Sequence, residues 1–191
     1  MAHYYTNDET RDEPSQFTFE LNGKNYVLDS NSGVFSRDKL DQGTRILLET
    51  VLNQQAKCGP VLDMGCGIGP VSKVIATEWN VPVTAIDVNE KAVALTKKNT
   101  AGLPVTALVQ DHVDDARYPL ILINPPIRTG KETMYGIIAD CVDHLTDDGV
   151  LWIVIRKQHG AQSLVKHLED KGCAVERAAR STGYWILKVR K

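Results

Sequence analysis

Asn124 stands at the end of an apolar run, Leu120–Ile123, and is followed by Pro125 and Pro126. Because proline has no backbone N–H, a buried strand over this run must stop at the asparagine. In open α/β sheets, ligands bind at the carboxyl ends of strands. The Asn124 amide oxygen and the Pro125 carbonyl are neutral acceptors, which suit a planar NH2 group whose nitrogen attacks an electrophile. The alternative is a strand followed by a Pro-Pro turn, with Asn124 only capping the strand.

A second stretch with chemical meaning is Asp63-Met64-Gly65-Cys66-Gly67-Ile68-Gly69. Its glycines let the backbone approach a ligand, and the helix predicted after it offers a positive N-terminus. Pro70 stands where the dinucleotide fingerprint has its third glycine, which disfavours a nicotinamide site. The Asp63 carboxylate would oppose a pyrophosphate but suits a ligand that carries an ammonium group.

Acidic residues follow the next two predicted strands. Asp87 ends the strand 81–86 and lies 20 residues after Gly67. An acid at this offset accepts hydrogen bonds from ribose hydroxyls in both dinucleotide and adenosyl sites. Asp111 follows the strand 105–109, where it either accepts from an adenine amino group or caps the loop.

Basic residues follow the prolines. The segment Ile127-Arg128-Thr129-Gly130-Lys131 is predicted as a flexible loop whose two cations could meet substrate phosphates.

Upstream, Asp41 is predicted to cap a helix. Polar residues before or within its first turn could line a ligand site, with ordinary capping as the alternative: Ser36, Arg37, Asp38 and Thr44. Four histidines are interpreted as surface or structural residues: His112, His144, His159 and His167.

The composition fits one globular domain, since 42% of the 191 residues are hydrophobic and 24% are charged. No apolar run approaches the ~20 residues of a membrane span, and no signal peptide is recognised, so a cytoplasmic location is expected. The four cysteines show no CxxC pair, and no metal site is predicted. Residues 156–191 hold nine Lys or Arg against three acids, which either attract phosphate or form a solvated face.

The order of predicted elements is β-α-β-α-β-β-α-β-α-β-β. This order predicts an α/β, Rossmann-like, doubly wound sheet of seven mostly parallel strands, with an antiparallel C-terminal strand. Residues 1–16 are expected to form a flexible acidic N-terminus. Residues 17–58 hold a β-hairpin around Asn22-Gly23 and a helix, and residues 59–191 form the Rossmann-like core. The hairpin is expected to pack on the edge of the core or to cover its site.

These motifs resemble a known family. The glycine-rich stretch, Asp87 and Asn124-Pro125-Pro126 are similar to class I S-adenosylmethionine-dependent methyltransferases that modify planar amino nitrogens. Gly33-Val34-Phe35-Ser36-Arg37-Asp38 with Asp41-Gln42-Gly43-Thr44 resembles the small-subunit ribosomal RNA guanine-N2 methyltransferases. The resemblance extends from about Phe17 onward. It implies methyl transfer from S-adenosyl-L-methionine to guanine N2, with ribosomal RNA or the small ribosomal subunit as partner and a monomer favoured.

The resemblance also implies residue roles. The target base would be turned out of its stack, as base-modifying enzymes require, and catalysis would be largely positioning. Asn124 and Pro125, followed by Pro126, would hold the target amine, Ile127 would pack on the base, and Arg128 and Lys131 would meet phosphates. The cofactor would contact Asp63, Gly65, Cys66, Gly67, Gly69, Asp87, Val88, Asn89, Asp111 and Asn124.

Three alternatives remain open. Asn-Pro-Pro also occurs in methyltransferases that act on protein glutamine side chains, although Ile127 in place of an aromatic residue, together with the basic loop, favours RNA. A nicotinamide oxidoreductase is disfavoured by Pro70. A non-enzymatic RNA-binding or assembly factor would not need Asp63, Asp87 and Asn124 intact.

Overall fold

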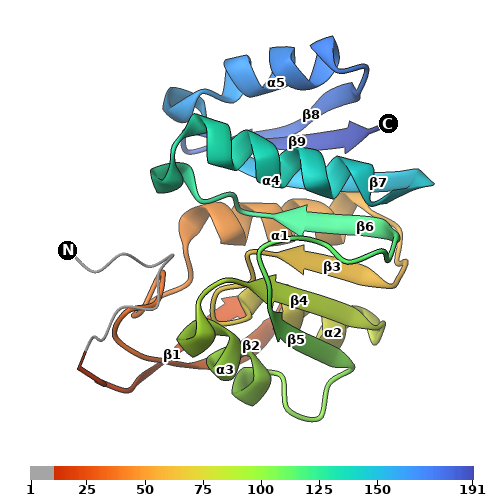
Figure 1. Cartoon of the computed structure of the whole chain (residues 1–191). Coiled ribbons are helices and arrows are strands. Elements are labelled where there is room, and N and C mark those ends of the chain that lie inside the picture. The colour runs from red at the N-terminus through yellow and green to blue at the C-terminus, as the bar shows by residue number, and fades with distance from the viewer. Residues whose placement is uncertain (1–10) are drawn as a thin grey trace.

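The computed structural model describes residues 11–191 and is built on one seven-stranded sheet with a separate hairpin (Figure 1). The strand order is β5-β4-β3-β6-β7-β9-β8, in which β9 alone runs against its neighbours. The predicted Rossmann-like sheet is therefore confirmed. Its antiparallel strand lies one place in from the edge.

The elements follow the predicted order. The hairpin strands are β1 (Ser15–Leu21) and β2 (Lys24–Ser30). The sheet strands are β3 (Val61–Met64), β4 (Val83–Asp87), β5 (Val105–Val109), β6 (Tyr118–Ile123), β7 (Leu145–Arg156), β8 (Ala174–Ser181) and β9 (Tyr184–Arg190). The helices are α1 (Gln42–Gln54), α2 (Pro70–Trp79), α3 (Glu90–Asn99), α4 (Lys131–Asp143) and α5 (Ala161–Asp170).

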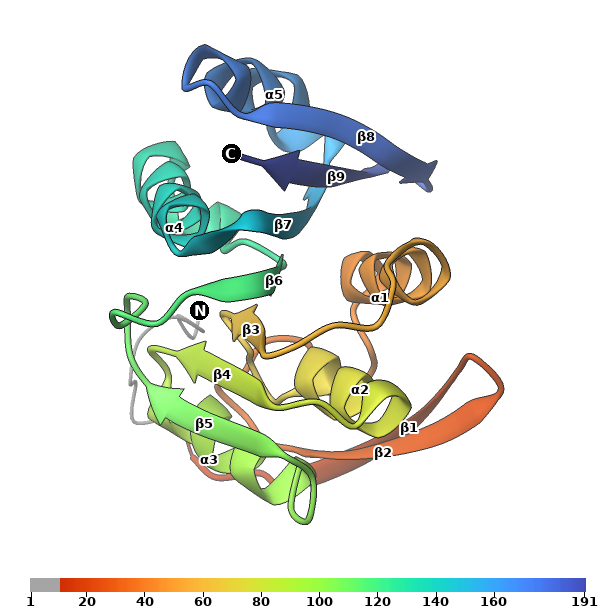
Figure 2. The same ribbon diagram turned by 90° about the vertical axis from the view of Figure 1, so that its right-hand side faces the viewer.

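Helices cover both faces of the sheet (Figure 2). On β6, Leu120 and Leu122 join the core formed with α1 and α2, whereas Ile121 and Ile123 join the core formed with α4 and α5. This alternation follows from the two-residue period of a strand. It explains why the run before Asn124 is apolar at every position.

The N-terminal hairpin packs on α2 and α3, and not on an edge of the sheet. The Tyr26 hydroxyl donates to Glu78 of α2 (2.7 Å), and Lys24 forms an ion pair with the same carboxylate (3.0 Å). The Asn99 amide of α3 bonds to the backbone of Asp29 through both its oxygen and its nitrogen (2.8 and 2.9 Å). Phe17 reaches the functional cavity described below, so the hairpin contributes to its wall.

Some predicted boundaries shift. Strand β7 begins at Leu145, so Asp147-Asp148-Gly149, a sequence typical of a turn, lies inside the strand, beside a register irregularity between Tyr118 and Leu120 of β6. The predicted flexible loop 127–131 is instead a 3-10 turn, Ile127–Thr129, followed directly by α4. Residues 1–10, most of the predicted flexible N-terminus, lie outside the described residues. Among the helices of residues 11–191, none has the length and apolar character that a membrane span requires.

Candidate functional site

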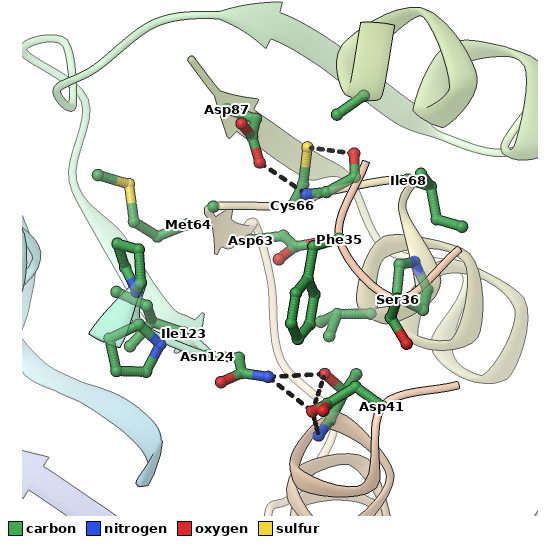
Figure 3. Close-up of a pocket in the computed structure, with 18 of the residues that line it drawn as sticks. Phe35, Ser36, Asp41, Asp63, Met64, Cys66, Ile68, Asp87, Ile123 and Asn124 are labelled. Atoms are coloured by element: carbon green, nitrogen blue, oxygen red, sulfur yellow. Dashed lines mark hydrogen bonds between the residues drawn. The ribbon is translucent and has the colours of Figure 1, made fainter. Parts of the chain in front are cut away.

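The carboxyl ends of β3, β4 and β6 open into one cavity of about 620 Å³, and the loop before α1 borders its other side (Figure 3). This is the edge at which parallel strands place ligands. The lining includes Phe35, Ser36, Lys39, Asp41, Thr44, Asp63, Gly65, Cys66, Gly67, Asp87, Val88, Asp111, Asn124, Pro125, Pro126, Ile127, Arg128, Arg156, His159 and Tyr184.

Asn124 follows the last residue of β6, and its side chain is fixed from the opposite wall. Its Nδ2 donates to Asp41 Oδ2 (2.9 Å) and to Thr44 Oγ1 (3.0 Å). A carboxylate only accepts hydrogen bonds, so the amide nitrogen, and not the oxygen, must face Asp41. Figure 3 shows the amide oxygen pointing away from these two partners. The predicted neutral acceptor is therefore held ready within the cavity lining.

Asp41 has two structural tasks at once. Its side chain is the N-cap of α1, since Oδ2 accepts from the Thr44 backbone N–H (2.9 Å) and from the Thr44 hydroxyl (3.3 Å). The same oxygen accepts from Asn124. The first turn of α1 is thereby joined to the end of β6. The prediction that Asp41 caps this helix is confirmed. The hydrogen bond between Asp41 and Asn124 was not predicted from the sequence.

Asp63 is buried at the end of β3. Its Oδ2 accepts from the Ser72 backbone N–H (3.0 Å) and from the Ser72 hydroxyl (2.6 Å). Burial raises the pKa of Asp63 to about 7, the Ser72 hydrogen bonds oppose this rise, and the nearby Asp87 charge adds to it. Within residues 11–191 no donor reaches Oδ1, which leaves that oxygen for the ammonium group of a ligand.

The glycine-rich turn is bound to Asp87. The Gly67 N–H donates to Asp87 Oδ2 (2.8 Å), and the Asn89 N–H donates to Oδ1 (2.9 Å). Burial raises the pKa of Asp87, and these backbone N–H groups oppose the rise. Gly65 and Gly67 have φ of +70° and +55°, and a Cβ at either position would enter open space. The turn therefore leaves bare backbone beside the cavity, where a ligand can approach closely.

Three predicted site residues do not line this cavity. Gly69 lies against Thr96 of α3, where an added Cβ would come within 3.0 Å of that side chain. Asn89 caps α3 by accepting from the Ala92 N–H (3.0 Å). The Lys131 ammonium lies 5.2 Å from the centre of the Tyr135 ring. Their predicted ligand contacts stay predictions.

Of the other candidate residues, some line the cavity and some lie outside it. Asp111 lines the cavity, and its carboxylate accepts from His112 (2.7 Å) in an exposed pair that holds the pKa of Asp111 below its usual value. Of the loop candidates before α1, Ser36 and Thr44 line the cavity, whereas Arg37 pairs with Glu13 (3.1 Å). Asp38 is exposed outside the lining.

Sequence reasoning missed the wall that the C-terminal strands contribute. Arg156 ends β7, and its Nε donates to the Tyr184 hydroxyl (2.9 Å) at the start of β9. His159, interpreted above as surface or structural, lines the cavity beside them. The rule that located Asn124, a polar residue directly after a buried strand, also applies to Arg156. Tyr184 gave no such signal, because it begins an antiparallel strand.

The cavity lining is divided by charge. Three of its acids, Asp63, Asp87 and Asp111, come from β3, β4 and the residues after β5, and a fourth, Asp41, comes from the start of α1. Two of its cations, Arg128 and Arg156, come from the residues after β6 and from the end of β7, and Lys39 comes from the loop before α1. Asn124 lies between the two halves, at the end of β6. One side is therefore suited to a cationic ligand and the other to an anionic one.

Comparisons with known proteins agree with this geometry. Residues 25–188 match the family described as Methyltransferase small domain. The uncharacterized protein YbxB of Bacillus subtilis is 35% identical over 99% of this chain and 98% of its own length. Ribosomal RNA small subunit methyltransferase C of Pseudomonas fluorescens is 33% identical over 83% of this chain, which spans about half of that enzyme (49%).

Among solved structures, the T. thermophilus 16S rRNA N2 methyltransferase RsmC, in complex with AdoMet and guanosine, superposes with a TM-score of 0.83. It covers 93% of this chain and 50% of its own, at 23% identity, and so supports the fold. The family match extends from β2 to β9 and includes every residue that lines the acidic half of the cavity. The chain belongs to the methyltransferase small domain family.

Proposed function

We propose that this protein transfers a methyl group from S-adenosyl-L-methionine to an exocyclic amine of a nucleobase, guanine N2 of small-subunit ribosomal RNA. The observation that carries the proposal is the Asn124 amide, whose nitrogen is engaged by Asp41 and Thr44. Its oxygen is left as a neutral acceptor beside two prolines in the cavity lining. The family membership and the small-subunit methyltransferases among the relatives support the same reaction.

The acidic half of the cavity fits the cofactor. When bound there, S-adenosylmethionine supplies an electrophilic methyl group on a positively charged sulfur. Asp63 Oδ1 is available to pair with an ammonium group, and the Gly65 and Gly67 backbone leaves room for a ligand. Asp87 can accept from ribose hydroxyls through its remaining lone pairs. The three acids of this half, Asp63, Asp87 and Asp111, favour a cationic ligand over a pyrophosphate.

The chain's own residues then position the acceptor. An exocyclic NH2 group has two hydrogens, and the Asn124 Oδ1 and the Pro125 carbonyl can each accept one. Donation from Asn124 to the Asp41 carboxylate polarises the amide, so its oxygen becomes a stronger acceptor. Holding the nitrogen in one orientation removes much of the entropic barrier to transfer. Ile127 and Phe35 provide apolar surface for a base turned out of its stack.

The charge of the cavity favours an acceptor in RNA over an acceptor in a protein. A glutamine side chain would offer the same NH2 group to Asn124. However, Arg128 and Arg156 line the acceptor half, and phosphate is the group that such cations recognise best. Methylation of a protein glutamine, or an assembly role without catalysis, therefore remain outcomes of the tests below.

The test is Asn124→Ala, assayed with labelled S-adenosylmethionine and unmodified small ribosomal subunits. Loss of one oriented acceptor should lower the transfer rate by about 10²–10³-fold, while the affinity for the cofactor stays within several-fold. Asn53→Ala, an exposed asparagine near the end of α1, is the matched control and should leave the rate unchanged. Near-normal transfer by Asn124→Ala would remove Asn124 from the mechanism.

A further inference from the structure

A set of exposed cations lies on β7 and β8 and directly after β7, and one of them, Arg156, lines the cavity. Arg156 is the last residue of β7, and the Lys157 N–H donates to the Gly183 carbonyl (2.9 Å) in the β8–β9 turn. Arg180 of β8 is in register with Trp185 of β9, which pairs in turn with Ile155 of β7. Arg156 and Arg180 therefore lie near the carboxyl ends of β7 and β8, at the same edge of the sheet as the end of β6.

The cations extend outward from the cavity along the edge strand. Arg177 lies on β8, and its guanidinium is 4.5 Å from the centre of the Trp185 ring. Stacking on an indole holds the planar fork in place while its N–H groups stay available. Arg156, Lys157, Arg177 and Arg180 are all exposed, and we name these four residues the basic strip.

The basic strip has no charge compensation within the described residues. Some cations elsewhere pair with carboxylates, as Lys24 does with Glu78, Arg45 with Glu49 and Lys98 with Asp29. No member of the basic strip forms an ion pair with the described part of the chain. Residues 149–168 and 177–191 contain no acid, so the segments that hold the basic strip supply no carboxylate of their own.

A surface of exposed cations that begins at Arg156 in the cavity lining is suited to a polyanion. Arginine forks match phosphate oxygens, and a strip that starts at the cavity could follow a single strand whose target nucleotide is turned inward. An acidic peptide would supply carboxylates, but it would not supply the base that the Asn124 acceptor and the apolar wall accommodate.

We propose that the basic strip binds the phosphodiester backbone of the RNA strand that flanks the target nucleotide. This inference rests on the proposed function for its ligand class, and it adds the surface on which the strand lies. The strand would leave the cavity past Arg156 and Lys157 and continue over Arg180 toward Arg177. Positions further from the cavity would contribute to affinity and not to chemistry.

The experiment compares two double variants by fluorescence anisotropy with a short labelled single-stranded RNA. Lys157→Ala/Arg180→Ala removes two strip cations that have no place in the proposed catalytic site. Lys57→Ala/Lys97→Ala removes two exposed cations that lie near the ends of α1 and α3, away from the cavity. The strip variant should show a slope of log affinity against log salt that is shallower by about 1.4, since each phosphate contact on a single strand contributes about 0.7.

A cofactor-induced rise in melting temperature serves as the folding control, and it should be equal in the wild type and both variants. Equal salt slopes in the two variants, with RNA binding intact in the wild type, would overturn the proposal that the basic strip binds RNA. The proposed function would be unaffected by that result. A wild type that binds no RNA and places its methyl label in protein would overturn both.

Discussion

At the scale of single residues, the site works by pairs in which one side chain fixes another. Asn124 is oriented by Asp41 and Thr44, and Asp63 is held by Ser72. In each pair, one polar atom is occupied and its neighbour is left for a ligand. The polar residues are therefore pre-oriented before any substrate arrives, which is the condition for catalysis by positioning.

Asp41 gives the first prediction. Asp41→Asn keeps the helix cap and keeps an oxygen within reach of Asn124, but it removes the charge. Asp41→Ser also caps α1, yet its shorter side chain does not reach Asn124. We expect methyl transfer to fall by about tenfold in Asp41→Asn and by about 10²-fold or more in Asp41→Ser. Single-turnover rates at saturating cofactor and RNA measure both.

Both Asp41 variants should melt near the wild-type temperature, because asparagine, aspartate and serine cap helices about equally well. The effect should appear in the maximal rate and not in the affinity for the cofactor. Equal rates in the serine and asparagine variants would show that Asp41 does not act through Asn124.

Asp63 gives a prediction for pH. With a pKa of about 7 in the folded chain against an ordinary 3.8, the folded state retains a proton that the unfolded state has lost between these values. Stability of the ligand-free protein therefore falls as pH rises through this window, and it levels off above 7. Asp63→Asn removes the ionisable group and keeps an acceptor for Ser72. Its melting temperature, relative to wild type, should be higher at pH 8 than at pH 5.

Ionisation of Asp63 lowers the stability of the ligand-free protein, but it should increase the affinity for the ligand. An ammonium group pairs with ionised Asp63, so wild-type affinity for S-adenosylmethionine should increase as pH rises from about 6 to about 8. Calorimetric titration of the wild type and of Asp63→Asn would test this, with weaker and pH-independent binding expected in the variant. If the wild-type affinity does not change over this pH range, ionised Asp63 does not pair with the ammonium group of the ligand.

At the scale of elements, the first turn of α1 is a junction. Its N-cap Asp41 contacts Asn124 of the β6 end, and its Gly43 lies against Tyr184 of β9. A Cβ at Gly43 would come within 2.9 Å of Tyr184 Cε1 and 3.0 Å of Asp41 Oδ2. The absence of a side chain at this position lets the helix and the C-terminal wall meet across the cavity.

Gly43→Ala should therefore disturb the site. In an open helix the change would stabilise by about 1 kcal/mol, but here it forces Tyr184 or Asp41 to move, so we expect no gain in stability and a lower transfer rate. Gly136→Ala in α4 is the matched control, because a Cβ there meets nothing within 4 Å. That variant should be more stable by up to about 1 kcal/mol and fully active. Equal stability and equal transfer rates in the two alanine variants would show that the close approach of Gly43 to Tyr184 does not matter for the site.

The hairpin is a second example of elements that are coupled through one residue. Asn99 of α3 bonds to the Asp29 backbone of β2, and its nitrogen also donates to the Ile68 carbonyl of the glycine-rich turn (2.8 Å). A buried amide with all three contacts ties the hairpin to the turn that borders the cofactor half. The hairpin is thus part of the support of the site as well as part of its wall.

At the scale of the whole molecule, much of the site was predictable because parallel strands end at one edge. That rule brought Asp63, Asp87 and Asn124 together correctly from the sequence. It could not place Tyr184, which faces the cavity from the start of an antiparallel strand, or the link between Asp41 and Asn124, which are 83 residues apart. Such a contact depends on how α1 packs on the sheet, and local patterns do not record it.

The positions of other predicted site residues have local causes. Lys131 was predicted beside the site because residues 127–131 have the composition of a loop, yet α4 begins at Lys131 and its side chain packs on Tyr135. Gly69 fits the motif but serves the close approach of α3. Composition identified the basic C-terminal third, whereas only the sheet register showed that Arg156 and Arg180 lie at the same edge of the sheet as the cavity.

The most direct measurement is transfer of labelled methyl from S-adenosylmethionine to three acceptors: unmodified small ribosomal subunits, free ribosomal RNA and a protein pool. Digestion of the labelled product then identifies the modified group. The account predicts label in N2-methylguanosine, with subunits and free RNA compared to identify the preferred form. Label in protein glutamine, or no transfer to any acceptor despite cofactor binding, would contradict it.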